Sequence, residues 1–317
     1  MSQDHPVLLF YKFVPITAPE RLAAEQRALC ARLELKGRVL VAEEGINGTL
    51  AGREESIAAY QTALRADPRF ADIEFKTSLG DPTTFPRLSI KVRAEIVTLG
   101  AGFPLPTDQD NLLSPSEWKH MLEEDPEVVL IDVRNRYESA VGKFEGAVAC
   151  EIENFRDLPA YLEKLEPYRE RKVLMYCTGG IRCEKASALF RHAGFERVFQ
   201  LHGGIVNYQK AFGNAHWLGE CFVFDGRMTT RVENDLIPIG TCAHSGRPTR
   251  RFVNCLHDPC HALFMLAEET ERQNPETRLC VECLSRGLTS ENADYKGSPA
   301  RQARPSGEGQ ASAFATP

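Results

Sequence analysis

Residues 176–187, YCTGGIRCEKAS, constrain the fold more than any other stretch of this sequence. The residues before Cys177, 173–176, form a short β-prone apolar run, which predicts a buried strand. The residues after the loop, 185–193, carry apolar side chains at helical spacing, which predicts a helix. Cys177 would then stand at the carboxyl end of a strand, in a loop that leads into a helix N-terminus. Repeated strand–helix units of this kind are typical of a parallel α/β domain.

The loop itself has the residue types of an anion cradle. At a helix N-terminus, unpaired backbone N–H groups point outward and the helix dipole favours negative charge, so a thiol there loses its proton easily. Gly179 and Gly180 allow the positive φ angles and the close backbone approach that a cradle requires. Arg182 brings a permanent positive charge that closes the loop or holds an anion. We therefore predict that Cys177 is a catalytic nucleophile; the alternative is a tight turn whose cysteine is merely buried.

The order of the predicted elements divides the chain into domains. Residues 1–99 alternate strand-like and helix-like patterns in the order βαββαβ, which predicts a ferredoxin-like domain of the α+β class. A linker rich in Pro, Gly, Asp and Asn covers 100–113. Residues 114–220 alternate strands and helices, which predicts the parallel α/β domain. A small Cys- and His-rich lobe (221–286) and a mobile, disordered tail poor in large apolar residues (287–317) complete the chain.

The composition is that of an ordinary globular protein, because hydrophobic residues make up 43% and charged residues 26% of the 317. No apolar run approaches the ~18 residues of a membrane-spanning helix, and the amino terminus lacks the pattern of a signal peptide. These features predict a cytoplasmic protein without membrane contact, whose ten cysteines are reduced and act as catalysts or metal ligands. A net charge of −6 argues against wrapping nucleic acid through a bulk positive field, but allows a local basic patch.

Four cysteines near the carboxyl end have the spacing of a zinc site. Cys280 and Cys283 form a C-x-x-C pair that can place two sulfurs on one metal ion, and Cys255 and Cys260 supply a second pair. Zinc held in this way would be structural, since four sulfurs leave no position for a water. The alternative is a set of free thiols buried under a small lobe.

The central domain resembles a rhodanese domain in four stretches: VLIDVRNRYE, KFEGAVAC, MYCTGGIRCEKASALF and VFQLHGGIVNY. In that family the loop cysteine carries a persulfide that backbone N–H groups cradle. The loop 177–182 has six residues, as in the sulfur-handling members, whereas phosphatases of the same fold have a loop one residue longer. Asp132 and Arg134 match the family's Asp-Val-Arg motif, for which we expect a structural role at the strand end. Gly203 and Gly204 match its closing turn.

A wider resemblance rests on four stretches that occur in this order: AEEGINGTLAG, FPRLSIKVRAEIV, CTGGIRCEKAS and GECFVFDGRM. Together they are similar to the tRNA uridine(34) hydroxylases, over roughly residues 6–286. That rhodanese-containing family makes 5-hydroxyuridine at the wobble position with molecular oxygen. The resemblance implies an oxidoreductase of the monooxygenase type, with a persulfide on Cys177 and with oxygen and a reductant as co-substrates. It also implies the anticodon loop of tRNA as a partner, together with a protein that donates sulfur.

Cys183, at the start of the predicted helix, is a candidate resolving thiol. Its attack on a sulfur bound to Cys177 would close a disulfide across the loop, and the alternative is a small buried helix residue. No flavin or nicotinamide fingerprint and no facial triad for iron is visible, so no such cofactor is predicted. The sequence departs from the family pattern at CAHSG, where Ser245 stands in place of a cysteine. This difference favours the zinc quartet given above over a site that includes Cys242.

Candidate phosphate-binding groups occur at both ends of the chain, and a wobble base would also stack on aromatic side chains. The basic candidates are Arg87, Lys91, Arg93, Arg247, Arg250 and Arg251, and the aromatic Phe252 follows Arg251. The alternative for each is a solvated charged surface.

Two other functions fit the loop 177–182. One is a plain sulfurtransferase, and the other is a non-catalytic redox or sulfide sensor that binds RNA or protein.

Overall fold

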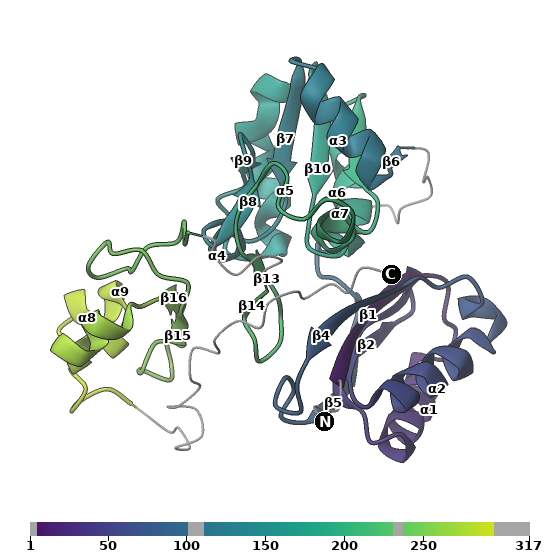
Figure 1. Cartoon of the computed structure of the whole chain (residues 1–317), viewed down its shortest axis with the longest axis horizontal. Helices are drawn as coiled ribbons and strands as arrows, with labels where there is room; N and C mark the ends of the chain where they lie inside the picture. The colour runs from purple at the N-terminus through teal and green to yellow at the C-terminus, as the bar shows by residue number, and fades with distance from the viewer. Residues whose placement is uncertain (1–4, 101–110, 231–236, 295–317) are drawn as a thin grey trace.

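The structure is a computed structural model that describes residues 5–100, 111–230 and 237–294. The chain forms a first domain, a central domain and a C-terminal lobe, and Figure 1 shows the first domain and the lobe below the central domain. Most of the predicted linker (101–110) and of the predicted tail (295–317) lies outside the described residues. No helix in the described ranges is long and apolar enough to cross a membrane.

The first domain is a five-stranded sheet in the order β4-β1-β3-β2-β5, antiparallel except where β5 pairs with β2. Its elements are β1 (His5–Phe13), α1 (Pro19–Arg32), β2 (Lys36–Ala42), β3 (Gly45–Ala51), α2 (Glu54–Arg65), a 3₁₀ turn (Pro68–Phe70), β4 (Phe75–Gly80) and β5 (Leu88–Val92). This order confirms the predicted ferredoxin-like βαββαβ unit, and β5 extends it at one edge.

Helix α1 ends earlier than the sequence pattern predicts. The apolar periodicity indicates a helix ended by Gly37, but α1 stops at Arg32, and Glu34 adopts a left-handed φ of 55°. Gly37 lies instead in β2, with a φ of 141°. A Cβ at this position would lie 2.2 Å from the Thr49 carbonyl oxygen of the neighbouring strand, so only glycine fits there. The glycine therefore permits close strand pairing and does not cap a helix.

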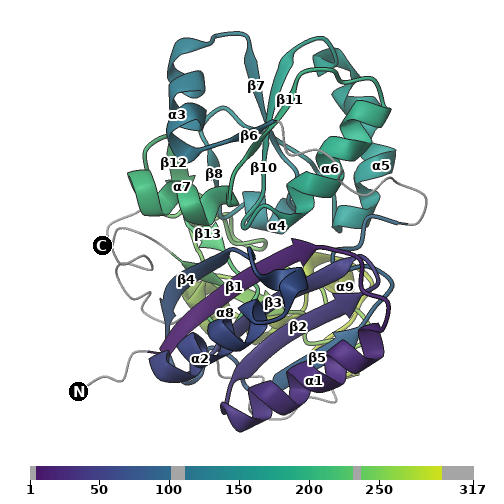
Figure 2. The same ribbon diagram turned by 90° about the vertical axis from the view of Figure 1, so that its right-hand side faces the viewer.

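Strand β1 is apolar on both of its faces, and each face has a different partner. Leu8 and Phe10 are buried in the core under α1 and α2, which cover one face of the sheet (Figure 2). Leu9 and Tyr11 alternate with them and point to the opposite face, which looks toward the central domain. Consequently β1 is covered on both faces, and the first domain docks on the central domain through this second face.

The central domain contains a parallel sheet in the order β6-β11-β10-β7-β9. Its elements are β6 (Leu112–Leu113), α3 (Pro115–Glu124), β7 (Val128–Asp132), α4 (Arg136–Ser139), β8 (Gly142–Phe144), β9 (Val148–Ala149), 3₁₀ turns (Phe155–Asp157 and Leu162–Tyr168), α5 (Leu158–Tyr161), β10 (Lys172–Tyr176), α6 (Ile181–His192), β11 (Val198–Leu201), α7 (Gly204–Phe212) and β12 (Trp217–Gly219). The predicted parallel α/β domain is confirmed. Strand β10 is the middle strand, and its last four residues are buried.

The C-terminal region has two parts that lie in different places. The hairpin β13 (Cys221–Phe222) and β14 (Thr229–Thr230) lies between the central and first domains (Figure 1). There the Gly226 N–H donates to the Thr84 carbonyl at 2.8 Å, and Arg227 donates to the Leu79 carbonyl at 2.5 Å. The elements of the lobe itself are β15 (Phe252–Asn254), β16 (Leu263–Met265), α8 (Glu268–Gln273), a 3₁₀ turn (Pro275–Arg278) and α9 (Val281–Ser285).

The lobe continues past residue 286, where the predicted tail begins. Leu288 and Ala293 pack on a cluster that contains the cysteines of the lobe. The Asp258 N–H also donates to the Asp294 carbonyl at 2.8 Å. Residues 287–294 therefore belong to the lobe, because these contacts fix both ends of the segment.

Candidate active site

Cys177 lies at the carboxyl end of the central strand β10, where the sequence pattern places it. Its side chain has no exposed surface, and its sulfur accepts a hydrogen bond from the Gly180 N–H at 3.1 Å. Gly180 adopts a φ of 102° and precedes the first residue of α6, Ile181. The positive φ turns the loop backbone so that its N–H groups face the sulfur, which is the geometry of an anion cradle.

The surroundings of Cys177 favour its thiolate. Burial alone would raise the pKa of this thiol. Hydrogen bonds from the Cys183 thiol and from the backbone N–H groups of Arg182 and Cys183, together with the charge of Arg182, outweigh burial and lower the pKa to about 5. Cys177 is therefore ionised at neutral pH, as the loop sequence predicts.

The pKa of Cys183 is shifted in the opposite direction to that of its neighbour Cys177. Burial raises its pKa well above the ordinary value, and the nearby negative charge of Cys177 raises it further. Its thiol is hydrogen-bonded to the Cys177 sulfur. In this state Cys183 is a protonated donor that stabilises the thiolate.

Arg182 closes the loop by pairing with a carboxylate. Its two terminal nitrogens donate to the two oxygens of Glu138 at 2.5 and 2.8 Å, and Glu138 has no exposed surface. Thr178 also donates to Glu138, at 3.4 Å. Because both terminal nitrogens are engaged by Glu138, Arg182 acts on the Cys177 sulfur through its charge and its backbone N–H. Sequence reasoning missed Glu138, although a buried arginine requires a carboxylate partner.

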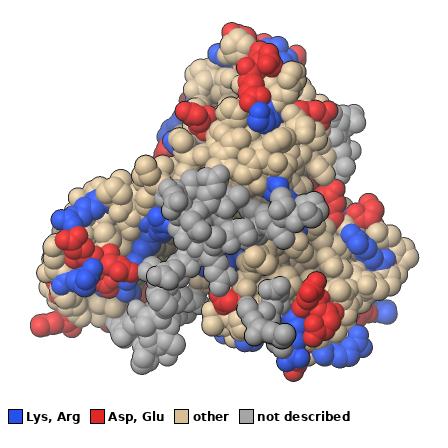
Figure 3. Space-filling view, in the orientation of Figure 1, with Lys and Arg blue, Asp and Glu red and all other residues tan. Residues whose placement is uncertain are grey.

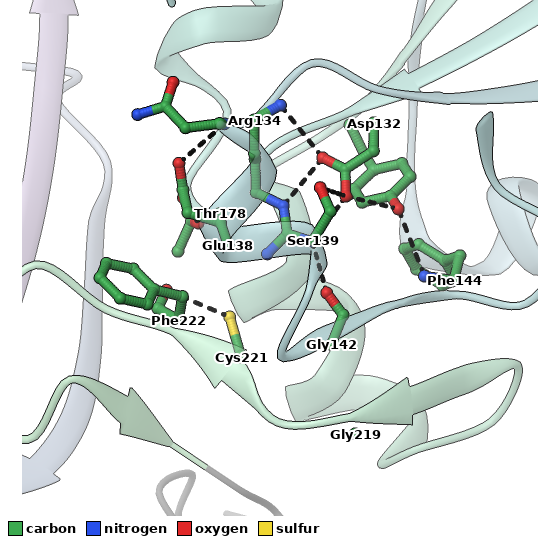
Figure 4. A network of polar contacts seen from close by, with 12 residues as sticks. Asp132, Arg134, Glu138, Ser139, Gly142, Phe144, Thr178, Gly219, Cys221 and Phe222 are labelled. Carbon is green, nitrogen blue, oxygen red and sulfur yellow. Dashed lines mark hydrogen bonds and ion pairs between the residues drawn. The ribbon is translucent and has the colours of Figure 1, made fainter. Parts of the chain in front are cut away.

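A second buried ion pair supports the strand end below the loop (Figure 4). Arg134 donates to Asp132 at 2.6 and 2.9 Å and to the Gly142 carbonyl at 2.6 Å. The hydroxyls of Tyr176 and Ser139 each donate to Asp132 at 2.9 Å. This network joins β7, β8 and β10 just before Cys177, which agrees with the structural role expected for Asp132 and Arg134.

The closing turn fixes the loop from the other side. The N–H groups of Ile205 and Val206, at the start of α7, donate to the carbonyls of Cys177 and Thr178 at 3.0 and 3.2 Å. A Cβ on Gly204 would lie 2.5 Å from the Cys177 carbonyl oxygen, so only glycine allows this approach. The pair Gly203–Gly204 therefore anchors the loop backbone.

A cavity of about 330 Å³ opens above the loop, between the first and central domains. Its floor includes Cys177, and its roof includes Tyr11 and Lys76 from the first domain. Phe224 and Arg227 of the connection between β13 and β14 close one side. A volume near 300 Å³ is at the lower end of the range for small-molecule sites, and it suits a nucleoside-sized ligand.

Buried ion pairs hold the two domains together beside this cavity. Lys185, in the second turn of α6, donates to Glu95 at 2.6 Å and to the Val97 carbonyl at 3.1 Å, and it pairs with Glu44 at 2.9 Å. Glu44 and Glu95 belong to the first domain and to the segment that follows it. The sequence CEKAS therefore contributes both a thiol to the site and a lysine to the domain interface.

The four cysteines of the predicted zinc site are brought together in the lobe. The sulfurs of Cys255, Cys260, Cys280 and Cys283 all lie within 4.8 Å of one another. Two of them, Cys260 and Cys280, are 3.6 Å apart. A tetrahedral zinc ion with Zn–S bonds of about 2.3 Å needs such spacing, so the donor set fits this metal. Cys242 lies elsewhere, with its sulfur 3.7 Å from the Thr270 hydroxyl.

The basic residues singled out in the sequence differ in their partners. In the C-terminal lobe Arg250 pairs with Glu220, while Arg247 and Arg251 pair with Glu269 and Glu271. Positive and negative side chains lie side by side on this lobe in Figure 3, at the left of the view. Arg87, Lys91 and Arg93 of the first domain are exposed. The lobe arginines are thus neutralised within the chain, which weakens their candidacy for phosphate binding.

Comparisons with known proteins agree with the three-part architecture. The chain matches the model of the UPF0176 acylphosphatase like domain over residues 5–96, that of the rhodanese-like domain over 114–211 and that of the rhodanase C-terminal region over 218–284. A solved rhodanese-like domain from Anabaena sp. is 28% identical with a TM-score of 0.30, covering 35% of this chain and 80% of that one. The match to the rhodanese-like family model, together with the parallel sheet and the cysteine loop, defines a rhodanese-domain protein.

Relatives that match over most of their length identify the family within the class of rhodanese-domain proteins. The tRNA uridine(34) hydroxylase of Corynebacterium jeikeium is 40% identical over 284 residues, covering 86% of this chain and 92% of the relative. The protein of the same name from Shouchella clausii is 42% identical over 297 residues, covering 88% and 90%. The chain belongs to the tRNA uridine(34) hydroxylase family. This confirms the family that the sequence motifs indicate.

Proposed function

We propose that the protein hydroxylates uridine 34 of tRNA at the wobble position to 5-hydroxyuridine, with molecular oxygen as the oxidant. The observation that carries this proposal is the ionised Cys177 sulfur on the floor of a nucleoside-sized cavity between two domains. A wobble base lies in a single-stranded loop and can turn into such a cavity with little unstacking. One oxygen atom enters C5, and the other leaves as water with two electrons from a reductant. The enzyme is accordingly an oxidoreductase of the monooxygenase type.

The loop supports a persulfide on Cys177. A persulfide is more acidic than a thiol, and the cradle of N–H groups with the Arg182 charge favours an anion at this position. A protein that donates sulfur would load it. Cys183 would act as the resolving thiol only after the negative charge of Cys177 is lost, because that charge keeps Cys183 protonated. Its attack on the Cys177 sulfur would then expel hydrosulfide, which takes up the Cys183 proton, and leave a Cys177–Cys183 disulfide. Two electrons from the reductant would return this disulfide to the two thiols before sulfur is loaded again.

The test is the nucleoside composition of tRNA from cells that contain the wild-type protein, a Cys177→Ser variant, or neither. We expect 5-hydroxyuridine and its derivatives at position 34 only with the wild-type protein. Unchanged uridine 34 together with loss of sulfur transfer from thiosulfate to cyanide would favour a plain sulfurtransferase. Full hydroxylation by the Cys177→Ser variant would overturn the assignment of Cys177 as the catalytic residue. A tRNA substrate also makes the cytoplasm the expected location.

We further propose that Cys255, Cys260, Cys280 and Cys283 hold one structural zinc ion, because four convergent sulfurs provide a tetrahedral thiolate site. The ion would supply folding energy to the lobe and no reactive water. Metal analysis of the purified protein should find one zinc per chain, and Cys280→Ser should lose it together with part of the thermal stability. A Cys242→Ser variant is the matched control and should keep the metal. A metal-free wild-type protein with an intact lobe would contradict this proposal.

A further inference from the structure

Lys76 is a buried lysine on the roof of the cavity. It lies in β4 opposite Leu9 of β1, on the sheet face that looks toward the sulfur loop, and only 7% of it is exposed. Within the part of the chain that the structure describes, its ammonium forms no hydrogen bond or ion pair. The ammonium lies over the Tyr11 ring, whose centroid is 5.1 Å away. A ring contact offsets only part of the cost of burying a charge, and the ammonium has neither a hydrogen-bond acceptor nor an ionic partner in the described parts of the chain.

The acidic groups nearest to Lys76 already have other partners. Glu74 pairs with His202 at 3.0 Å. Glu184, in the first turn of α6, accepts a hydrogen bond from the Tyr11 hydroxyl. The remaining negative group near Lys76 is Cys177, which lies at the bottom of the same cavity. The ammonium therefore faces the space that a ligand above Cys177 would occupy, with free donor capacity.

We propose that Lys76 binds the O4 carbonyl oxygen of the uracil base and thereby selects uridine over cytidine. This inference rests on the proposed function and adds the group that recognises the base. An ammonium has three donors and no acceptor. At C4 uridine carries an oxygen that accepts a hydrogen bond, whereas cytidine carries an amino group that can only donate. A cytidine in the same position would bring donor against donor and leave the buried charge of Lys76 unpaired.

A different role for Lys76 would be to neutralise the Cys177 thiolate and nothing else. The two roles make different predictions for a Lys76→Met variant, in which the side chain keeps most of its length and loses its charge. If Lys76 only offsets the thiolate, its loss raises the pKa of Cys177 and leaves base preference intact. If Lys76 reads the base, its loss removes the preference, whatever happens to the thiol.

The experiment uses two synthetic anticodon stem-loops that differ only in uridine or cytidine at position 34. Each is titrated into the full-length protein, and protection of Cys177 from iodoacetamide is followed by mass spectrometry of its peptide. For the wild-type protein we expect half-protection at a roughly 10- to 100-fold lower concentration of the uridine RNA. Lys76→Met should reduce this ratio to about one. A Lys36→Met variant, which removes an exposed lysine of β2 outside the cavity, should keep the ratio of the wild type.

The Lys76→Met variant should fold, because it replaces an unpaired buried charge with an apolar side chain, and its melting temperature checks this. Retention of the full uridine preference by folded Lys76→Met would overturn the proposal, and so would a wild-type protein without any preference. Hydroxylation of the uridine RNA is measured in parallel. Preference in the protection assay without hydroxylation would leave the role of Lys76 supported and would contradict only the proposed reaction.

Discussion

The Tyr11 hydroxyl of the first domain lies directly above Gly180 of the sulfur loop, so that a Cβ on Gly180 would lie 2.7 Å from it. Leu9 lies above Gly179 in the same way, at 2.8 Å. The absence of a side chain at Gly179 and Gly180 therefore has two structural consequences. Their small size admits the N–H cradle around Cys177 on one side and the close approach of strand β1 on the other. The first domain is thus part of the active site and completes its roof.

The first prediction concerns this contact. Gly179→Ala places a methyl group 2.8 Å from Leu9 Cδ2 without straining the backbone, because Gly179 does not have a positive φ. We expect a loss of about 1–3 kcal/mol in stability and a fall in hydroxylation as the domains are pushed apart. The double variant Gly179→Ala with Leu9→Ala removes the overlap and should recover most of the activity. Equal activity of the single and double variants would show that the contact does not matter.

The second prediction concerns the ionisation of Cys177. In protein freed of sulfane sulfur by cyanide, the rate of alkylation of Cys177 should be level at neutral pH and fall to half near pH 5, the pKa to which the loop lowers this thiol. Cys183→Ala removes a hydrogen-bond donor to the thiolate and should raise that midpoint by about one unit. Cys183→Ser is the matched control, because its hydroxyl still donates. Identical midpoints in both variants would show that Cys183 does not tune its neighbour.

The third prediction concerns the Arg182–Glu138 pair. Glu138→Gln keeps the shape of the side chain and removes its charge, which leaves the buried guanidinium without its carboxylate partner. The expected cost is about 3–5 kcal/mol, seen as a melting temperature lower by roughly 10 °C. Glu282→Gln breaks the exposed pair with Arg286 and should change the melting temperature by less than about 2 °C. Similar shifts for the two variants would mean that the buried pair contributes no more than a surface one.

Much of the site could be predicted from the sequence, since it is local. Residues 173–193 specify a strand, a glycine turn and a helix in continuous order, and this alone places Cys177, Arg182 and Cys183. The four zinc-site cysteines likewise fall into two short motifs. Local pattern and turn chemistry suffice wherever the partners are near in the chain.

The rest of the site depends on how distant segments meet, which periodicity does not encode. Glu138 pairs with Arg182, which is 44 residues away in the chain. Lys76 lines the cavity only because the helix-free face of the first domain's sheet packs against the central domain. One signal was available: β1 is apolar at Leu9 and Tyr11 as well as at Leu8 and Phe10. A strand with two apolar faces is covered on both sides, so the open face of the ferredoxin-like sheet had to be an interface.

The fourth prediction concerns the RNA surface. Arg38 of β2 is exposed at the rim of the cavity and has no carboxylate partner among the described residues, unlike Arg250 and Arg251 of the lobe. Its position beside the opening suits a phosphate next to the inserted base.

Arg38→Ala should weaken binding of the uridine and cytidine stem-loops equally and reduce the slope of log K against log salt by about one. The ratio between the two RNAs should stay unchanged, which distinguishes this contact from that of Lys76. Arg21→Ala removes one charge from α1, which covers the opposite face of the sheet, and should leave the slope unaltered. If both variants reduced the salt slope equally, the effect would come from the net charge of the protein. A specific phosphate contact would be lost only in Arg38→Ala, since Arg21 lies away from the cavity.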